Sequence, residues 1–305
     1  MVLPAYNAES HLKEALDSVF AQSYRPIEVV VVDDGSTDAT AEIVKGFPDV
    51  RYVCQNNRGP SAARNAAIGI AQGALIAFID ADDVWEPAKL NEQVAILCAA
   101  PEAGLVFSNM RHFSESGDLQ PSMFAKYGLT AEFFGEDRRV LDCVSKLVRT
   151  NFIPTSSVVA RKDAVVGVGG FDEGIRKAED WDLWLRIALR SPIVYSAKVL
   201  MQKRVHEVNV SRDAEGMNVA ALRVLEKLRV EHHELLSKLG VDMTVTLRDG
   251  YRNLGYFYIR QMSISKARAA LRRSLSLGFQ LRSLLYLIST LLGRRFVSSV
   301  VRARG

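Results

Sequence analysis

The stretch ALIAFIDADDVWEP, residues 74–87, carries the clearest structural signal in the chain. It opens on apolar residues that predict a strand buried on both faces, as in a parallel sheet. Three aspartates, Asp80, Asp82 and Asp83, follow at once, although like charges repel. Burying them as anions costs several kcal/mol apiece unless a cation neutralises them. The stretch therefore predicts a buried strand that ends in a ligand site, or else a solvated acidic turn before a helix near Pro87.

Strand and helix signals alternate along the chain up to this stretch. Strands are predicted at residues 1–6, at 50–55 and in the β-branched run that starts at Ile27, and helices at 8–22, 39–47 and 61–73. This order predicts an α/β layered fold with a mixed, mainly parallel sheet. Ligands bind such sheets at the carboxyl ends of the strands, where PAYN (4–7), DDGSTD (33–38) and DADD (80–83) would converge.

The rest of the chain divides into an irregular part and a helical part. Strands are predicted at 103–109 and 155–160 and a helix at 178–190, whereas helical spacing covers 216–240, 251–278 and 281–301. We therefore expect one α/β domain over residues 1–212 and a basic, helical C-terminal appendage over residues 213–305.

Charge is distributed unevenly between these parts. Of the 305 residues, 48% are hydrophobic and 24% charged, which is typical of a globular protein and excludes wholesale disorder. From Arg248 to Arg304, twelve Lys or Arg residues stand against Asp249, for a net charge of +11, whereas the preceding 27 basic and 34 acidic residues give −7. The C-terminal region therefore predicts an anionic partner.

Cysteine usage and hydropathy bear on the compartment. Cys54, Cys98 and Cys143 are widely spaced, and no two have metal-ligand spacing, which predicts reduced thiols in the cytosol. The N-terminus enters a strand-like MVLP without a signal-peptide pattern, and no apolar run reaches the roughly 20 residues that span a bilayer. We expect a cytoplasmic protein that is at most peripheral at the inner face of the plasma membrane.

The last predicted helix has an apolar face with basic residues beside it. The face comprises Leu281, Leu284, Leu285, Ile288, Leu291 and Leu292, with Arg282, Arg294 and Arg295 flanking it. Two interpretations stay open: the helix docks onto the α/β domain, or it lies on the anionic inner leaflet of a membrane. Nucleic acid is not expected, because the basic residues form no known reading motif.

Several carboxylates and one histidine stand where ligand-binding or catalytic groups would. Carboxylate oxygens are ligands that Mg²⁺ prefers, often together with phosphate oxygens. Asp34 ends a strand, where it can accept a hydrogen bond from a base or a ribose, although a capped turn is the alternative. Glu179 and Asp180 open a helix, and a raised pKa would let such a carboxylate act as a general base. His206 is a metal or phosphate ligand, or else a structural histidine.

Seven motifs occur together in one order. They are PAYN, VVDDGSTD, NRGPSAARNAAI, FIDADDVWEP, VGGFDE, AEDWDLWLRIA and RVHEVNVS. Over residues 1–211 the chain resembles the family 2 glycosyltransferases, which have a Rossmann-like layered GT-A fold and use nucleotide sugars with inversion at the anomeric carbon. The resemblance implies a nucleotide-sugar half over about residues 1–100 and an acceptor half over about residues 101–212.

The resemblance also implies a nucleotide site. The family's loop that packs around the base corresponds, by this resemblance, to Pro4, Ala5, Tyr6 and Asn7. Asp34 resembles the carboxylate that reads the base, and Arg64 resembles a nucleotide-contacting arginine. The expected donor is a nucleoside-diphosphate sugar, with a UDP-sugar favoured.

DADD resembles the Asp-x-Asp motif of the family, which meets the ribose and the metal. Asp82 is expected to hold Mg²⁺ or Mn²⁺, with Asp83 as the second choice and Asp80 as a supporting nucleotide contact. His206 matches a histidine that reaches the metal or the diphosphate in some relatives.

The catalytic group and the acceptor loop come from later motifs. Asp180 resembles the catalytic base, with Glu179 beside it, and Gly169, Gly170 and Phe171 resemble a loop near the acceptor. The implied reaction is a single displacement in which Asp180 removes the acceptor's proton, a contribution of about 10²–10⁴-fold. The expected acceptor is a saccharide or lipid-linked saccharide in cell-surface polysaccharide or glycan biosynthesis.

Two alternative functions stay open, and the chain departs from the family pattern at one place. A sugar-nucleotide pyrophosphorylase would want a Gly-rich loop with Lys or Arg after the first strand, where this chain has PAYNAES. A non-catalytic nucleotide-binding scaffold is the other alternative. Relatives usually have several more residues before PAYN, so we expect either a start upstream of Met1 or a shortened first strand.

Overall fold

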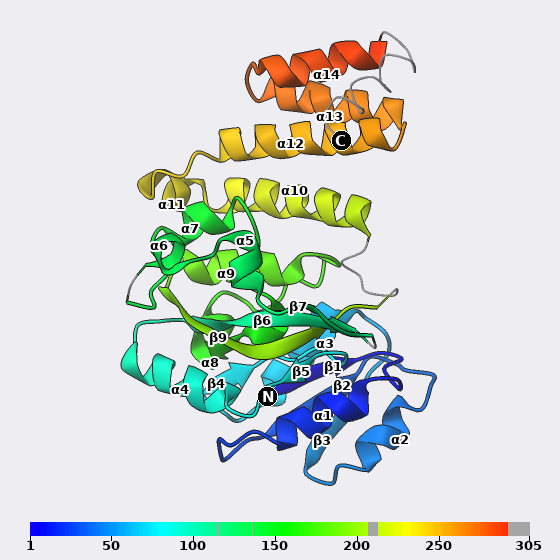
Figure 1. Ribbon diagram of the computed structural model, residues 1–305, viewed down its shortest axis with the longest axis vertical. Helices are drawn as coiled ribbons and strands as arrows, with labels where there is room; N and C mark the ends of the chain where they lie inside the picture. The colour runs from blue at the N-terminus through cyan, green and yellow to red at the C-terminus, as the bar shows by residue number, and fades with distance from the viewer. Residues whose placement is uncertain (115, 136, 207–212, 292–305) are drawn as a thin grey trace. The chain divides into compact units, whose positions relative to one another are not determined.

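The computed structural model describes residues 1–114, 116–135, 137–206 and 213–291. The chain divides into two compact units, Met1–Asn209 and Val210–Gly305. The first unit is α/β, and the described part of the second contains helices only (Figure 1). Residues 207–212, which include the expected domain boundary, and Leu292, Arg294 and Arg295 of the expected apolar helix lie outside the described residues.

The first sheet is parallel and consists of β1 (Val2–Ala5), β2 (Val29–Asp33) and β3 (Val50–Cys54) in that order. Its strands are connected by α1 (Leu12–Phe20) and α2 (Thr40–Lys45), and α3 (Pro60–Ile70) follows β3. Every residue of β2 is buried, which explains why its sequence is an unbroken β-branched run rather than an alternating one.

The second sheet is mixed. Its path is β4 (Leu75–Ala77), β8 (Val159–Arg161), β6 (Leu105–Ser114), β9 (Ile193–Arg204) and β5 (Val84–Trp85), and β7 (Gly117–Gln120) pairs with β6. Strands β6 and β9 are parallel, whereas the other pairs in this sheet are antiparallel. A parallel bridge between Val2 and Phe78 joins the two sheets. The predicted mixed α/β architecture is confirmed, with its antiparallel pairs confined to residues 75–204.

The remaining helices of this unit differ greatly in length. They are α4 (Lys89–Ala99), α5 (Met123–Tyr127), α6 (Ala131–Phe134), α7 (Cys143–Leu147), α8 (Lys162–Gly167) and α9 (Glu179–Ala188), with a 3-10 turn at Thr155–Ser157. The predicted helix at 178–190 is confirmed as α9. Helices α5 to α7 were not predicted, because four or five residues are too few to show a 3.6-residue period.

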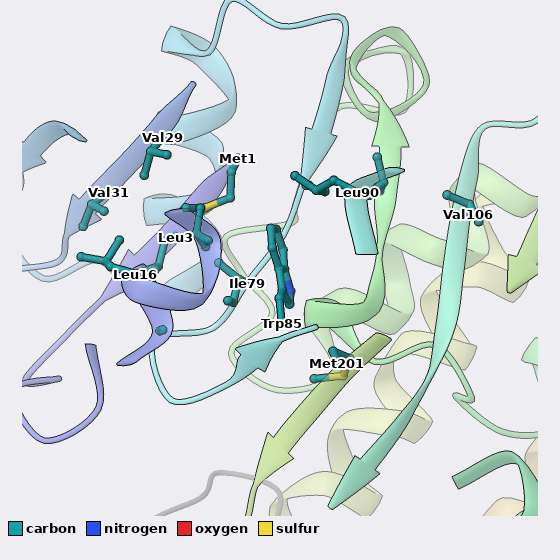
Figure 2. Close-up of a cluster of buried hydrophobic side chains, with 14 of the residues drawn as sticks. Met1, Leu3, Leu16, Val29, Val31, Ile79, Trp85, Leu90, Val106 and Met201 are labelled. Atoms are coloured by element: carbon teal, nitrogen blue, oxygen red, sulfur yellow. The ribbon is translucent and has the colours of Figure 1, made fainter. Parts of the chain in front are cut away.

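One hydrophobic cluster holds the strand ends in place. Figure 2 shows Leu3 of β1, Leu16 of α1 and Ile79 after β4 together with Trp85 and Met201. Leu3, Leu16 and Ile79 are fully buried, and each such side chain contributes about 1.5–3 kcal/mol. The Trp85 indole also donates a hydrogen bond to the Ser156 carbonyl at 2.8 Å. These contacts fix the backbone from which the polar motifs project.

The second unit contains α10 (Ala214–Glu231), α11 (His233–Lys238), α12 (Met243–Arg260), α13 (Ile264–Ser276) and α14 (Leu281–Leu291). The prediction of a single helix over residues 216–240 is wrong, because the helix is interrupted at His232. A Cβ on Gly255 would lie 2.6 Å from Leu271, so α12 and α13 approach closely at this glycine. No helix within the described residues is long and apolar enough to cross a bilayer.

Candidate active site

The first two predicted motifs are joined at the carboxyl ends of β1 and β2. The Asn7 amide N–H donates to Ser36 Oγ, and Asn7 Oδ1 accepts from the Thr37 amide, both at 2.9 Å. Asn7 has a positive φ of 46°, which turns the chain away from β1. Tyr6, next to it, is 54% exposed, so a large aromatic face stands open to a ligand at this strand end.

Asp34 organises the turn that leads into α3. Its side chain is buried and accepts from Gln55 Nε2 at 2.7 Å, from the Arg58 amide at 2.8 Å and from the Gly59 amide at 2.7 Å. An ionised carboxylate offers about four lone-pair sites. Three of these sites are therefore used within the protein.

Arg64 connects three of the predicted motifs. Its guanidinium donates from Nη2 to Asp80 Oδ1 at 2.7 Å and from Nη1 to Glu179 Oε1 at 2.8 Å, and it lies 5.2 Å from the Phe171 ring centre. Burial would lower the pKa of Arg64, but the attraction of Asp80 and Glu179 outweighs it and raises that pKa. Arg64 is thus a permanently charged link between the DADD turn and the start of α9.

Asp82 and Asp83 face in different directions. Asp82 Oδ2 lies 2.9 Å from His206 Nε2, and these two side chains are 30% and 29% exposed. Asp83 is 3% exposed and accepts from the Arg204 amide at 3.1 Å. Burial, with repulsion from Asp82 and Asp80, raises the pKa of Asp83 to about 8. Asp82 and His206 are therefore open to a ligand, whereas Asp83 is not.

This pair fits a divalent cation that also takes oxygen ligands from its substrate. Among the described residues no three His, Cys, Asp or Glu side chains gather in a metal-binding arrangement. Mg²⁺ commonly uses only one or two carboxylates and completes its shell with phosphate oxygens and water, and Mn²⁺ also accepts carboxylate oxygen. A site built on Asp82 and His206 would hold such an ion together with a diphosphate, not in a closed protein cage.

Asp180 lies at the start of α9 in a prepared environment. The Thr155 hydroxyl donates to its Oδ2 at 2.9 Å, and Asn151 Nδ2 donates to its Oδ1 at 3.3 Å. Burial, and then the charge of Glu179, raises the pKa of Asp180 to about 6. Sequence reasoning missed Thr155 and Asn151, which stand in no motif. Because Glu179 is bound to Arg64, Asp180 is the better placed of the two predicted catalytic carboxylates to take a proton.

Lys203 of β9 is a second cation among these carboxylates, and sequence reasoning missed it. Burial would lower the pKa of Lys203, but the charges of Asp83, Asp80, Asp180 and Asp82 outweigh it and raise that pKa. On the neighbouring strand β6 its partner in the register is His112. His112 Nε2 is buried without a hydrogen-bond partner among the described residues. Lys203 is thus close enough to four aspartates, from two distant parts of the chain, for their charges to raise its pKa.

The glycine loop before α9 is held by side chains rather than left open. Asn65 donates to the Phe171 carbonyl and accepts from its amide, both at 2.9 Å, while Arg186 donates to the Gly170 carbonyl at 2.8 Å. Gly169 and Gly170 have φ values of +87° and +70°. Phe171 is 2% exposed, so its ring supports the loop from inside the core.

A cavity elsewhere in this unit belongs to a different region. It has a volume of about 320 Å³ and is lined mainly by apolar residues, among them Met1, Leu75, Leu90 and Val159. Met1 and Leu75 lie at the amino ends of β1 and β4, whereas the acidic motifs follow the carboxyl ends. The cavity is therefore separate from the carboxylate site.

A mixed α/β sheet with acidic motifs after its strands, and a carboxylate of raised pKa at the start of a later helix, agrees with the GT-A fold of glycosyltransferases. Residues 1–154, just over half of the chain, match the family model named glycosyl transferase family 2. The chain belongs to this family.

Curated relatives agree with this assignment. An uncharacterized glycosyltransferase of Rickettsia prowazekii is 27% identical over 221 residues, which are 70% of this chain and 66% of that relative. The Escherichia coli protein WfaP, named UDP-Glc:alpha-D-GlcNAc-diphosphoundecaprenol beta-1,3-glucosyltransferase, is 25% identical over 246 residues, which are 77% of this chain and 89% of WfaP. The chain thus spans just under two thirds of the first relative and most of the second.

Solved structures share the fold. The Staphylococcus aureus protein TarS, residues 1–349 in complex with UDP-GlcNAc, superposes with a TM-score of 0.70 at 20% identity, covering 99% of this chain and 90% of that one. The mannosyltransferase PcManGT from Pyrobaculum calidifontis, in complex with GDP-Man and Mn²⁺, gives a TM-score of 0.58 at 21% identity, covering 98% and 82%.

Proposed function

We propose that the chain is a metal-dependent, inverting glycosyltransferase. It moves a sugar from a nucleoside-diphosphate donor, a UDP-sugar, to a saccharide or lipid-linked saccharide acceptor in the synthesis of a cell-surface glycan. The observation that carries this proposal is that Arg64 bonds both Asp80 and Glu179, which brings the DADD turn with Asp80, Asp82 and Asp83 next to Asp180. Four carboxylates from two distant segments have no reason to meet for stability alone, since each repels the others.

The donor is assigned to the strand-end side of the site. The exposed Tyr6 ring offers a stacking surface for the base, and Asp34 accepts from the base. Asp82 and His206 would hold Mg²⁺ or Mn²⁺, which when bound neutralises charge on the departing diphosphate. Lys203 adds a positive charge from the protein itself. Asp83, the second choice for the metal, takes a supporting role instead, because its carboxylate accepts from the Arg204 amide.

The acceptor is assigned to the α9 side of the site. Asp180 takes the proton of the attacking hydroxyl, and its raised pKa makes it a stronger base than an ordinary aspartate. Thr155 and Asn151 orient it by hydrogen bonds to both carboxylate oxygens. Attack in line with the leaving diphosphate inverts the anomeric carbon in a single displacement, so no covalent enzyme intermediate is required.

The relatives support the proposed substrates. The name of WfaP gives it a UDP-sugar donor and a diphosphoundecaprenol-linked acceptor. TarS binds UDP and UDP-GlcNAc in its crystal structures. Membership of family 2 argues against a sugar-nucleotide pyrophosphorylase. A non-catalytic scaffold is disfavoured because it would have no use for the raised pKa of Asp180.

The proposal is tested by titrating UDP into the protein by calorimetry with and without Mn²⁺, and by measuring UDP release from a panel of UDP-sugars. We expect Mn²⁺ to strengthen UDP binding, and Asp82→Ala to remove that gain. Asp17→Ala, at an exposed aspartate of α1, is the matched control and should change nothing. Asp180→Asn should keep UDP binding and lose transfer. A protein that binds no nucleoside diphosphate with Mn²⁺ present would refute the proposal.

A further inference from the structure

Helix α14 turns its apolar side outward. Phe279, just before the helix, is 74% exposed, and the exposed fractions of Leu281, Leu285, Ile288 and Leu291 are 59%, 53%, 40% and 61%. The residues that α14 buries are Ser283, Tyr286, Ser289 and Thr290. A helix on a globular protein normally does the reverse, with its apolar stripe facing the core.

Hydrogen bonds hold the polar side of α14 inward. Ser283 Oγ lies 2.9 Å from Ser274 Oγ of α13 and donates to Gln280 Oε1 at 2.8 Å. Arg268 of α13 donates to the Thr290 carbonyl at 2.6 Å and to its hydroxyl at 3.2 Å. Rotating the helix to bury its leucines would break these bonds and leave buried polar groups unpaired. The outward apolar face is therefore built into the unit.

Contiguous exposed apolar surface marks an interaction site, and the charge of this region indicates the partner. From Arg248 to the C-terminus there are twelve Lys or Arg residues and one acid. Arg282 lies on the first turn of α14 beside Leu281 and Leu285, and both Arg282 and Arg272 of α13 are exposed. A second copy of the chain would bring the same excess of positive charge against itself, which opposes self-association through this face.

We propose that α14 is a membrane-surface helix that binds an anionic phospholipid bilayer. Phe279, Leu281, Leu285 and Ile288 enter the boundary between headgroups and acyl chains, and the neighbouring arginines meet anionic headgroups. This inference goes beyond the proposed sugar transfer and does not depend on it, because it rests on residues of the second unit alone.

The test is co-sedimentation of the full chain with vesicles. We expect binding to phosphatidylcholine vesicles that contain phosphatidylglycerol, weak binding to phosphatidylcholine alone, and release of the protein at high salt. The double variant Leu285→Gln/Ile288→Gln should weaken binding by at least about tenfold, since two apolar side chains leave the bilayer. Arg282→Glu should weaken binding to the anionic vesicles only.

A matched control replaces two exposed apolar side chains on other helices of this unit. Val230 of α10 and Val245 of α12 are 71% and 42% exposed, and Val230→Gln/Val245→Gln should leave vesicle binding unchanged. All these positions are exposed, so circular dichroism should show every variant folded.

Three outcomes would overturn the proposal. The first is a wild-type chain that does not sediment with anionic vesicles, and the second is an α14 variant that binds them as well as wild type does. The third is an α14 variant that loses thermal stability or dissociates a dimer in light scattering, which would mean that protein covers this face. Sugar transfer to a water-soluble acceptor should be the same in all the variants, so a failure here is distinguishable from a failure of the proposed function.

Discussion

The Arg64 guanidinium donates to the Glu179 carboxylate at 2.8 Å, although the two residues lie 115 positions apart in the chain. Arg58 and Glu173 form a second pair at 2.7 Å with the same separation in sequence. The pairs differ in burial: the side chains of Arg64 and Glu179 are 6% and 13% exposed, and those of Arg58 and Glu173 are 63% and 40% exposed.

Removing the buried arginine should be far more damaging than removing the exposed one. Arg64→Met leaves Asp80 and Glu179 without their cation, and we expect it to lower the free energy of unfolding by about 3–5 kcal/mol. Arg58→Met should cost less than about 1 kcal/mol, because an exposed pair is screened by solvent. Urea unfolding followed by tryptophan fluorescence measures both. Equal losses in the two variants would show that Arg64 is not the link described here.

The rate of sugar transfer should depend on the ionisation of Asp180. With its pKa raised to about 6, Asp180 is protonated below that pH and cannot accept a proton. We therefore expect kcat/KM to fall about tenfold for each pH unit below 6 and to level off above it.

Removing the hydrogen bond from Thr155 to Asp180 should shift the acid limb of the pH profile. Thr155→Val removes a donor that favours the ionised carboxylate, so the pKa of Asp180 should rise and the acid limb should move to higher pH. Thr150→Val, at an exposed threonine nearby in sequence, should leave the profile in place. An acid limb that stays fixed in Thr155→Val would mean that another group titrates.

Loss of the Lys203 charge should weaken nucleotide binding. Lys203→Met leaves four aspartates without this cation, and an anionic diphosphate then meets stronger repulsion. We expect the Kd for UDP with Mn²⁺ to rise about tenfold, the order expected for one lost charge-assisted contact. Lys198→Met, on the same strand but 65% exposed, is the matched control. If the two variants have the same Kd by calorimetry, Lys203 does not face the nucleotide.

The two loop glycines should tolerate alanine unequally. Both have positive φ, but a Cβ on Gly170 would lie 2.7 Å from Asn65 Oδ1, whereas a Cβ on Gly169 would contact nothing within 4 Å. We expect Gly169→Ala to cost about 1 kcal/mol of stability and Gly170→Ala about 2–3 kcal/mol. Asn65→Ala in the Gly170→Ala background should cost less than the two single losses combined. Additive losses would place the strain elsewhere.

Much of the fold was predictable because local signals agree with the final structure. Buried β-branched or apolar runs bounded by polar turns mark β2 and β4, and helical spacing marks α1, α3 and α9. The two-residue strand β5 was not predicted, because its strand character comes only from pairing with β9. Likewise nothing in residues 216–240 marks the break at His232, which separates two helices of similar composition.

The site was predictable in its motifs but not in its contacts. Each acidic motif follows a strand, and Asp80, Asp82 and Asp34 could be singled out for that reason. The pairing of Arg64 with Glu179 depends on how α3 and α9 meet, and the position of Lys203 depends on the register of β9. One sequence holds no record of such long-range contacts. The roles of these residues in binding and catalysis remain predictions for the experiments above.

Helix α3 connects the Asp34 turn to α9 and the glycine loop. At the amino end of α3, Asp34 accepts hydrogen bonds from the amides of Arg58 and Gly59. About 8 Å further along the helix, Arg64 bonds α9 and Asn65 bonds the glycine loop. If the base binds at Asp34 as proposed, a shift of this carboxylate would be passed along α3 to α9 and the glycine loop. Such coupling would favour ordered binding, with the donor first and the acceptor second.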